Sequence, residues 1–500
     1  MDYAIAALDI GKTNKKIVVY TPDLRPVHTS RQSVPCITQN GLEVEDTASL
    51  RSWLVDALSC AASHYPVRAI AVAAHGATFA CLGQDGRLAF PVLSYTNEPG
   101  EDFHRAFFDR YGSASELQAR TATLQLPALI NLAQGIEYAR VRFPDEMRRA
   151  SAILFYPQYF GYLLTGRVAA ELTYAGSHTY LWDFDAGRWS EVALQMGVDQ
   201  LLPARPGQPW DILGTLSAEM AEATGLSREV MVTLGIHDSN ASLLPYLLRT
   251  TDDFVLNSTG TWCVAMHNET EVRFAPDEIG AAVYYNITAF GNPLKSANLM
   301  AGFEYDSFAR CFTELFSVLP QSAYDPELYR RVVAEKRCFV LPGIVANSGQ
   351  YPRSRAAVFI DGNRIEFEQL EASPDQFASI DAEQLYAALN LSLAIQTRVA
   401  LTRAGLRPGA AVFTEGGFRN NEAYLALLTA LLPGNPSYVT SLDEATAFGA
   451  AITAKVAYER IAPSAVTGLY DIETRLVPET QLQGIEEYAT MFDRLACPAS

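Results

Sequence analysis

The chain has 500 residues, more than one compact core usually holds, so we expect two or three domains. The formal net charge is −18 and no long run of Lys or Arg occurs, which argues against a nucleic-acid partner. No apolar run approaches the roughly 18 residues that a membrane helix needs, and the start of the chain lacks the basic segment of a secretory signal. The seven cysteines form no CxxC pair, so we expect reduced thiols and a cytoplasmic location.

The first predicted element is a β-hairpin. Residues 4–9 form an apolar strand, residues 16–20 a second strand, and a turn with one glycine joins them. The backbone N–H groups of such a turn can surround terminal phosphates, while the carboxylate of Asp9 holds a hydrated metal ion. The alternative is an ordinary hairpin turn, since Asp and Asn are common in turns.

A helix is predicted next, because apolar residues recur at helical spacing between Leu50 and Ala61. A buried strand at residues 69–74 then runs into His75 and Gly76. A histidine at the end of such a strand can face a bound ligand. The alternative is a core histidine whose hydrogen bonds are satisfied within the protein.

The strand at residues 230–234 runs into the sequence GIHD at 235–238, and a helix is predicted to follow. The carboxylate of Asp238 can take a proton from a hydroxyl bound in a cleft, with His237 orienting the same molecule. The alternative is structural, because Asp is a common N-cap residue of helices.

The opening pattern of strand, glycine turn and strand returns at residues 254–257, 258–261 and 262–266. This recurrence predicts a duplicated architecture, with a second phosphate-binding turn that forms a clamp with the first. We place the boundary near residue 246, which gives an N-terminal domain at 1–245, a C-terminal domain at 246–460 and a tail at 461–500.

The C-terminal half is predicted to continue with a helix at 382–404, a strand at 411–414 and a helix at about 421–432. Strands that alternate with helices indicate an α/β fold with largely buried sheets. Between the last strand and helix, Gly416 and Gly417 would let an adenine or a ribose approach the backbone closely. The alternative is a tight turn from strand to helix.

Taken in order, these motifs resemble those of the FGGY family of carbohydrate kinases, from Asp9 to about Lys455. They are DIGKTNKK at 9–16, HGAT at 75–78, GIHD at 235–238, NSTGTW at 257–262, EGGFRNN at 415–421 and AFGAA at 447–451. The His-Asp pair, the NSTGTW turn and residues 295–300 look most like the rhamnulokinase and fuculokinase branch. The resemblance implies two ribonuclease-H-like domains of the actin and hexokinase superfamily, with a cleft between them.

The resemblance also implies a reaction, the transfer of the γ-phosphoryl group of ATP to a sugar hydroxyl with Mg²⁺. Asp238 would be the base. The residues facing the sugar would be His75, Gly76, Asn97, His237 and Asn298. Those binding the nucleotide would be Asp9, Lys12, Thr13, Asn14, Lys16, Gly260, Thr261, Gly416, Gly417 and Asn420, with Asp9 contacting the metal through water.

The chain departs from the family pattern at Asn97, where relatives often carry Asp or Arg, and at Glu415, which stands where the nucleoside motif commonly has glycine. The first departure leaves the acceptor open: a ketose such as L-fuculose, L-rhamnulose or a pentulose, or a polyol or sugar acid. Other classes are an actin-like ATPase and a silent sugar sensor, although Asp9 and Asp238 together count against a silent protein. The only partners expected are a sugar and ATP, without nucleic acid or membrane, and a homodimer stays open.

Overall fold

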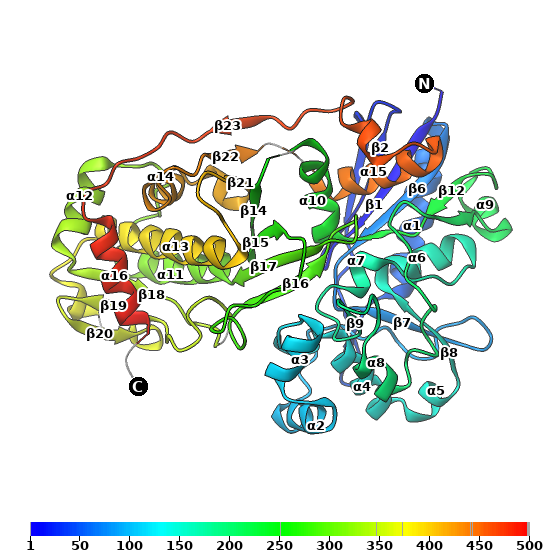
Figure 1. The fold of residues 1–500 in the computed structure, drawn as a ribbon, viewed down its shortest axis with the longest axis horizontal. Helices are drawn as coiled ribbons and strands as arrows, with labels where there is room; N and C mark the ends of the chain where they lie inside the picture. The colour runs from blue at the N-terminus through cyan, green and yellow to red at the C-terminus, as the bar shows by residue number, and fades with distance from the viewer. Residues whose placement is uncertain are drawn as a thin grey trace.

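Two seven-stranded sheets form the framework of the molecule (Figure 1). The computed structural model describes residues 2–250, 252–346, 348–372, 374–440, 442 and 444–497. The helix α10 (Asp238–Arg249) lies between the two sheets and leads from the first half of the chain into the second.

The first sheet has the strand order β11-β12-β6-β1-β2-β3, and β13 also pairs with β6. Its strands are β1 (Ala4–Ile10), β2 (Asn14–Tyr20), β3 (Pro26–Ser33), β6 (Val67–Ala74), β11 (Ile212–Thr215), β12 (Met231–Thr233) and β13 (Ile236–His237). β1 and β6 are buried along nearly their whole length, as a sheet covered on both faces requires.

The second sheet has the order β16-β17-β15-β14-β21-β22-β23. Its strands are β14 (Phe254–Thr259), β15 (Cys263–Asn268), β16 (Val283–Ile287), β17 (Pro293–Leu299), β21 (Ala411–Gly416), β22 (Ser437–Thr440) and β23 (Thr474–Leu476).

The two sheets share one topology. In each, an antiparallel meander of three strands (β1-β2-β3 and β14-β15-β17) continues, on the other side of its first strand, into two parallel strands (β6-β12 and β21-β22). This common order confirms the duplicated α/β architecture that the two glycine turns predict.

Most helices of the first half surround the first sheet or build the region beneath it in Figure 1. They are α1 (Thr47–His64), α2 (Glu101–Tyr111), α3 (Ala114–Thr121), α4 (Leu132–Arg142), α5 (Pro144–Arg148), α6 (Tyr156–Thr165), α7 (Leu172–Ala175), α8 (Glu191–Met196) and α9 (Ala218–Thr224). Small antiparallel pairs are formed by β4 (Ile37–Gln39) with β5 (Leu42–Val44), β7 (Phe79–Gly83) with β8 (Ala150–Phe155), and β9 (Trp182–Asp183) with β10 (Arg188–Trp189).

The helices of the second half are α11 (Ala301–Phe316), α12 (Pro326–Glu335), α13 (Ala382–Ala404), α14 (Glu422–Leu431), α15 (Ala445–Glu459) and α16 (Ile485–Ala496). Four short 3₁₀ turns are η1 (Phe367–Gln369), η2 (Pro374–Phe377), η3 (Gly417–Asn420) and η4 (Pro463–Val466), and a three-stranded sheet contains β18 (Cys338–Leu341), β19 (Ala357–Ile360) and β20 (Asn363–Glu366). The sequence predicts both ends of α13: Asp381 and Gln384 form a capping box, and Gly405 ends the helix in the left-handed region.

Helix α15 comes late in the chain but packs on the first sheet, where Figure 1 shows it beside β1, β2 and β6. Ala447 and Ile452 of α15 share a hydrophobic cluster with Ile5 of β1. The helix also lies against α10, because a Cβ atom at Gly449 would fall 1.8 Å from the carbonyl oxygen of Ala241. The boundary near residue 246 falls inside α10 and stays a prediction.

The predicted tail contributes to the second sheet and its core. β23 pairs with β22, and the Tyr488 hydroxyl of α16 donates to the carbonyl of Cys338 at 2.7 Å. Residues 498–500 lie outside the described residues. In the part of the chain that the structure describes, no helix combines the length and the apolar character needed to cross a membrane.

Candidate active site

The first predicted phosphate turn joins β1 to β2. Asp9 and Lys16 are register partners in this hairpin, and Lys16 Nζ lies 3.2 Å from Asp9 Oδ2. Burial raises the pKa of the Asp9 carboxyl above its ordinary value, and the Lys16 ammonium opposes that shift. Thr13 and Asn14 are exposed at the tip of the turn.

The second predicted phosphate turn follows β14, and the predicted nucleoside segment follows β21. These two strands are parallel neighbours, with Thr259 opposite Gly416. The Thr259 hydroxyl accepts a hydrogen bond from the N–H of Phe418 at 3.0 Å, which fastens the two segments together. Gly260 and Thr261, next in the chain, are exposed, as are Gly416, Gly417 and Asn420. The hydrogen-bonding register of the sheet therefore brings both motifs to one edge.

A cavity of about 450 Å³ lies at this edge. It is lined by Asp238, Ser239, Ser242, Ser258, Glu415, Gly416, Arg419, Asn420, Leu442, Glu444, Ala445 and Thr446. The cavity thus joins the predicted base, Asp238, to the predicted nucleoside contacts Gly416 and Asn420.

Asp238 is the first residue of α10. The N-cap of this helix is His237, whose side chain makes no capping hydrogen bond, so the N-cap interpretation of Asp238 is wrong. Instead, Asp238 Oδ1 accepts from the N–H of the next residue, Ser239, at 2.7 Å. The Asp238 side chain is 31% exposed, which leaves it accessible from the cavity. Burial raises its pKa above the ordinary value, and the hydrogen bonds from Ser239 oppose the increase.

His75 directly follows β6 and His237 ends β13, which pairs with the end of β6. Nδ1 of His75 lies 2.9 Å from the carbonyl of Gly76, and Nδ1 of His237 lies 3.4 Å from Asp238 Oδ1. Burial lowers the pKa of each of these two imidazoles to about 4, so both rings are neutral near pH 7. The predicted sugar contacts His75 and His237 are therefore brought together beside the predicted base.

Gly76 lies where a side chain would collide with this cluster. A Cβ atom there would fall 2.7 Å from Nε2 of His237 and 2.5 Å from Cε1 of His178. Only glycine fits between the two rings. Sequence reasoning missed His178, which stands in the stretch AGSHTY at 175–180 without a periodic pattern or a motif to mark it.

The other two predicted sugar contacts differ in their surroundings. All polar atoms of the Asn97 side chain bond to backbone: Oδ1 to the N–H of Glu43, and Nδ2 to the carbonyls of Glu43 and Ser94. Asn97 thereby holds the 94–97 turn against residue 43. Asn298, on β17, has a buried Oδ1 without a hydrogen-bond partner in the described part of the chain, and it does not line the cavity that contains Asp238.

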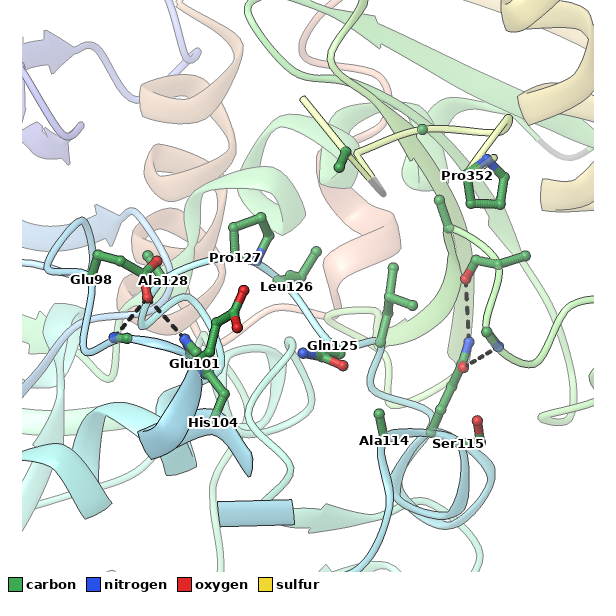
Figure 2. A pocket seen from close by; sticks show the side chains of 18 residues that line it. Glu98, Glu101, His104, Ala114, Ser115, Gln125, Leu126, Pro127, Ala128 and Pro352 are labelled. Carbon is green, nitrogen blue, oxygen red and sulfur yellow. Dashed lines mark hydrogen bonds and ion pairs between the residues drawn. The ribbon is translucent and has the colours of Figure 1, made fainter. Parts of the chain in front are cut away.

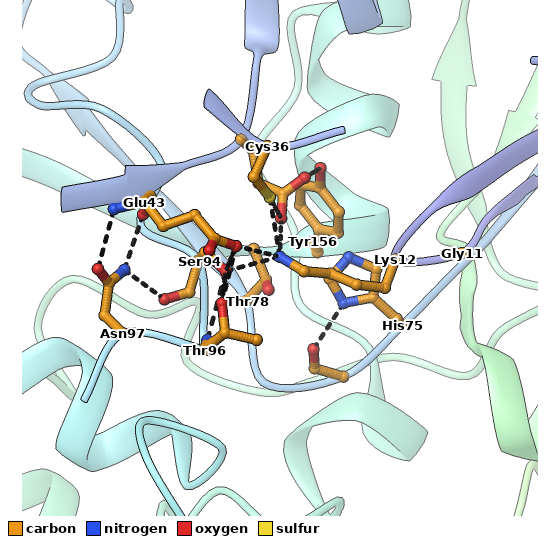
Figure 3. A network of polar contacts seen from close by, with 12 residues as sticks. Gly11, Lys12, Cys36, Glu43, His75, Thr78, Ser94, Thr96, Asn97 and Tyr156 are labelled. Atoms are coloured by element: carbon orange, nitrogen blue, oxygen red, sulfur yellow. Dashed lines mark hydrogen bonds and ion pairs between the residues drawn. The ribbon is translucent and has the colours of Figure 1, made fainter. Parts of the chain in front are cut away.

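The Lys12 side chain takes part in a polar network that includes Cys36 and Ser94 (Figure 3). Its ammonium donates to Glu45 Oε1 at 2.8 Å, Ser94 Oγ at 2.6 Å and Cys36 Sγ at 2.9 Å. An ammonium has three N–H groups, so these contacts use all of them. The Lys12 ammonium is therefore bound within this network, whereas the Lys16 ammonium contacts Asp9.

A larger cavity of about 700 Å³ lies elsewhere, between the region of α2 and α3 and the 280–282 segment (Figure 2). Its walls include Glu98, Glu101, His104, Gln118 and Gln125, and none of the predicted site residues lines it. Glu98 is held by His104 and by the N–H of Gly100. The smaller cavity, which contains Asp238, is the better candidate for chemistry.

Comparison with known proteins covers nearly the whole chain. Residues 4–245 match the model of the N-terminal domain of the FGGY family of carbohydrate kinases. Residues 251–463 match the model described as carbohydrate kinase FGGY, C-terminal domain.

Among curated relatives, the chain is 26% identical over 244 residues to a rhamnulokinase from Bacteroides thetaiotaomicron, which covers 48% of the chain and 49% of that protein. It is 24% identical over 280 residues to an L-fuculokinase from Escherichia coli, which covers 54% of the chain and 57% of the relative. The chain thus spans about half the length of the curated relatives it matches.

Solved structures extend the likeness over both domains. A carbohydrate kinase from Novosphingobium aromaticivorans superposes with a TM-score of 0.80 at 27% identity, covering 99% of this chain and 98% of the other. A xylulose kinase from Lactobacillus acidophilus superposes with a TM-score of 0.77 at 14% identity, covering 99% and 96%, which shows the shared fold. With two family models matched in order and the fold shared throughout, the chain belongs to the FGGY family of carbohydrate kinases.

Proposed function

We propose that this protein is an ATP-dependent kinase that phosphorylates a hydroxyl of a neutral sugar, with Asp238 as the general base. One observation carries the proposal: Asp238 shares a cavity with the nucleoside-side residues Gly416 and Asn420, and it touches His237 of the histidine cluster. A carboxylate between a nucleotide site and a hydroxyl site is where phosphoryl transfer needs a base.

In this mechanism the acceptor hydroxyl lies beside Asp238 and gives its proton to the carboxylate as its oxygen bonds to the γ-phosphorus of ATP. The bond from that phosphorus to the β,γ-bridging oxygen breaks, and ADP leaves. The two glycine turns hold the phosphates from two domains, with Lys16 and Thr261 as donors. Asp9 is suited to contact Mg²⁺ through water, because Mg²⁺ prefers one or two carboxylates together with phosphate oxygens, and the Asp238 carboxylate is near enough to raise the pKa of Asp9. When bound, the metal neutralises phosphate charge.

The acceptor class follows from the charges around the histidines. A sugar acid would need a cation for its carboxylate, but the Lys12 ammonium already spends its three N–H groups on Glu45, Ser94 and Cys36. Asp238 itself would repel a second carboxylate. These contacts favour a ketose or a polyol. Within that class, the relatives named rhamnulokinase and L-fuculokinase favour L-rhamnulose, L-fuculose or a pentulose.

The first test is a coupled assay of ADP release with L- and D-ketoses, polyols and sugar acids, and a control without acceptor. A neutral acceptor should stimulate ADP release. Release that no compound stimulates would favour the actin-like ATPase, and stimulation by sugar acids alone would overturn the neutral-acceptor assignment.

The second test is Asp238→Asn, which keeps the size of the side chain but cannot take the proton. We expect kcat to fall by roughly 10²–10⁴-fold with little change in ATP binding. Asp381→Asn is the matched control, because Asp381 is the N-cap of α13 and Asn caps helices about as well as Asp. Near-native turnover by the Asp238 variant would remove Asp238 from the role of base.

A further inference from the structure

His178 is held in an unusual conformation at the end of the segment that follows α7. Its φ of 42° lies in the left-handed region, and so does the φ of 63° at Tyr180. Such backbone is costly for residues other than glycine and is concentrated at functional sites. Nδ1 of His178 lies 3.2 Å from the carbonyl oxygen of Ile130, which fixes the orientation of the ring.

The His178 ring lies beside that of His237 and forms a histidine cluster with His75 and His237. Its centroid lies 5.6 Å from that of His237, with the two ring planes inclined at 72°. From an ideal Cβ at Gly76, Nε2 of His178 is 2.6 Å away and Nε2 of His237 is 2.7 Å away. The two Nε2 atoms therefore converge beside Gly76.

The cluster contains several buried nitrogen atoms without partners. Nε2 of His75 and both ring nitrogens of His237 make no hydrogen bond, although His75 and His237 are only 6% and 4% exposed. Buried polar atoms in native proteins are nearly always hydrogen-bonded, so these atoms indicate a polar molecule that completes their bonding. In the part of the chain described, no group of three or more His, Cys, Asp or Glu side chains is placed to hold a metal ion.

The chemistry of that molecule follows from the protons on the rings. A backbone carbonyl can only accept, so Nδ1 of His178 carries hydrogen and Nε2 is left as an acceptor when the ring is neutral. Burial lowers the pKa of His178 to about 3, which keeps it neutral near pH 7. His75 has the same arrangement, since its Nδ1 faces the carbonyl of Gly76. Acceptors of this kind recognise hydroxyl donors.

We propose that His178 is a specificity-determining residue of the acceptor site, where its Nε2 accepts a hydrogen bond from a hydroxyl other than the one phosphorylated. The assignment rests on the proposed function, because it requires a polyhydroxylated acceptor beside Asp238. His178 then selects among neutral sugars through the hydroxyl that it binds, while Asp238 takes the proton of a different hydroxyl.

His178→Asn is the sharpest variant. Asn tolerates positive φ better than most residues, and its amide can still donate to Ile130, but it has no atom at the position of Nε2. We expect the KM of the acceptor to rise about 5- to 150-fold while kcat and the KM of ATP change much less. His64→Asn, at the exposed end of α1, is the matched control and should leave all three constants as they are.

Deoxy analogues of the best acceptor separate recognition from a structural effect. For the native enzyme, kcat/KM should be lower with one deoxy analogue than with the parent acceptor. For the His178→Asn variant, the parent acceptor and that analogue should give similar values of kcat/KM. His178→Gln, which places an amide near the position of Nε2, should recover part of the affinity and also serves if the Asn variant fails to fold. An unchanged acceptor KM in a folded variant, or equal sensitivity of both proteins to every analogue, would overturn the inference alone. Absence of acceptor-stimulated ADP release from the native enzyme would overturn the proposed function and this inference together.

Discussion

The Lys16 ammonium, on β2, lies 2.8 Å from Oε2 of Glu444, a residue 428 positions later that directly precedes α15. The same ammonium lies 3.2 Å from Asp9, so one cation joins two carboxylates at the edge of the cavity that Asp238 lines. Arg31 also contacts Glu444. Lys16 is therefore positioned before the nucleotide binds, at the side of the cavity where the phosphates are expected.

Lys16→Met should weaken ATP binding more than acceptor binding. The lost contact is a charge-assisted hydrogen bond, so we expect the KM of ATP to rise about 10- to 150-fold. Steady-state kinetics with each substrate varied in turn measure the effect. Glu444→Gln is the companion variant: it removes a carboxylate that repels phosphate, so it should not raise the KM of ATP. If both variants raise that constant equally, Lys16 acts only through Glu444.

Lys12→Met should act on stability and leave the KM of ATP unchanged. The Glu45 side chain is only 1% exposed, and removal of Lys12 leaves this buried carboxylate without its ion-pair partner. Breaking one partner of a buried ion pair costs about 3–5 kcal/mol of unfolding free energy. Urea unfolding should show that loss, and the double variant Lys12→Met/Glu45→Gln should recover much of it. A single variant as stable as the native protein would show that Glu45 does not depend on Lys12.

The pH dependence of kcat/KM should reflect the raised pKa of Asp238. A general base works in its ionised form, so activity should fall as pH decreases through the pKa of Asp238 in the folded protein. Because burial raises that pKa, the acid limb should lie above the value near 3.9 of an ordinary Asp. His75 protonates only near pH 4 and therefore contributes no positive charge above the limb. A profile that stays flat down to pH 4 would contradict the assignment.

Glu171 should make the protein less stable as pH rises. Its side chain is fully buried at the N-terminus of α7, and burial raises its pKa to about 8 in the folded protein from an ordinary value of 4.5. Between these values the folded state binds more protons than the unfolded state, so the unfolding free energy decreases with increasing pH across that window. Thermal melting between pH 5 and about 8 should show this slope, and Glu171→Gln should reduce it. An equal slope in the variant would assign the dependence to other groups.

The sequence predicts the elements near the chemistry because glycine turns and strand ends are local signals. The hairpins at residues 9–16 and 257–263, the strand before His75, and the bounds of α13 follow from turn chemistry and apolar periodicity. The resemblance to the kinase family, and not a local signal, places His75 and His237 near the same ligand, and the pairing of β13 with β6 brings them together.

The remainder depends on packing between distant segments. His178 reaches the cluster because α7 packs against β13. There the Thr173 hydroxyl accepts a hydrogen bond from the N–H of His237 at 3.1 Å. Lys12 and Lys16 are four positions apart and equally basic, yet one ammonium pairs with Glu45 and the other with Glu444. No local pattern encodes either partner. The N-cap interpretation of Asp238 was wrong for a related reason: the side chain that caps best by statistics sits one position inside the helix.

The position of α15 has a consequence for synthesis of the chain. The apolar face of the first sheet, with Ile5, Ala7 and Val18, is completed by a helix whose last residue is Glu459. During synthesis, α15 is therefore made more than four hundred residues after the first strands. Until then it cannot cover that apolar face. Closing so long a loop is slow, and exposed apolar strands associate with other chains in the meantime. An N-terminal fragment such as residues 1–245 would keep this face open permanently, so dissecting the enzyme into halves should yield aggregates that only co-expression with the second half relieves.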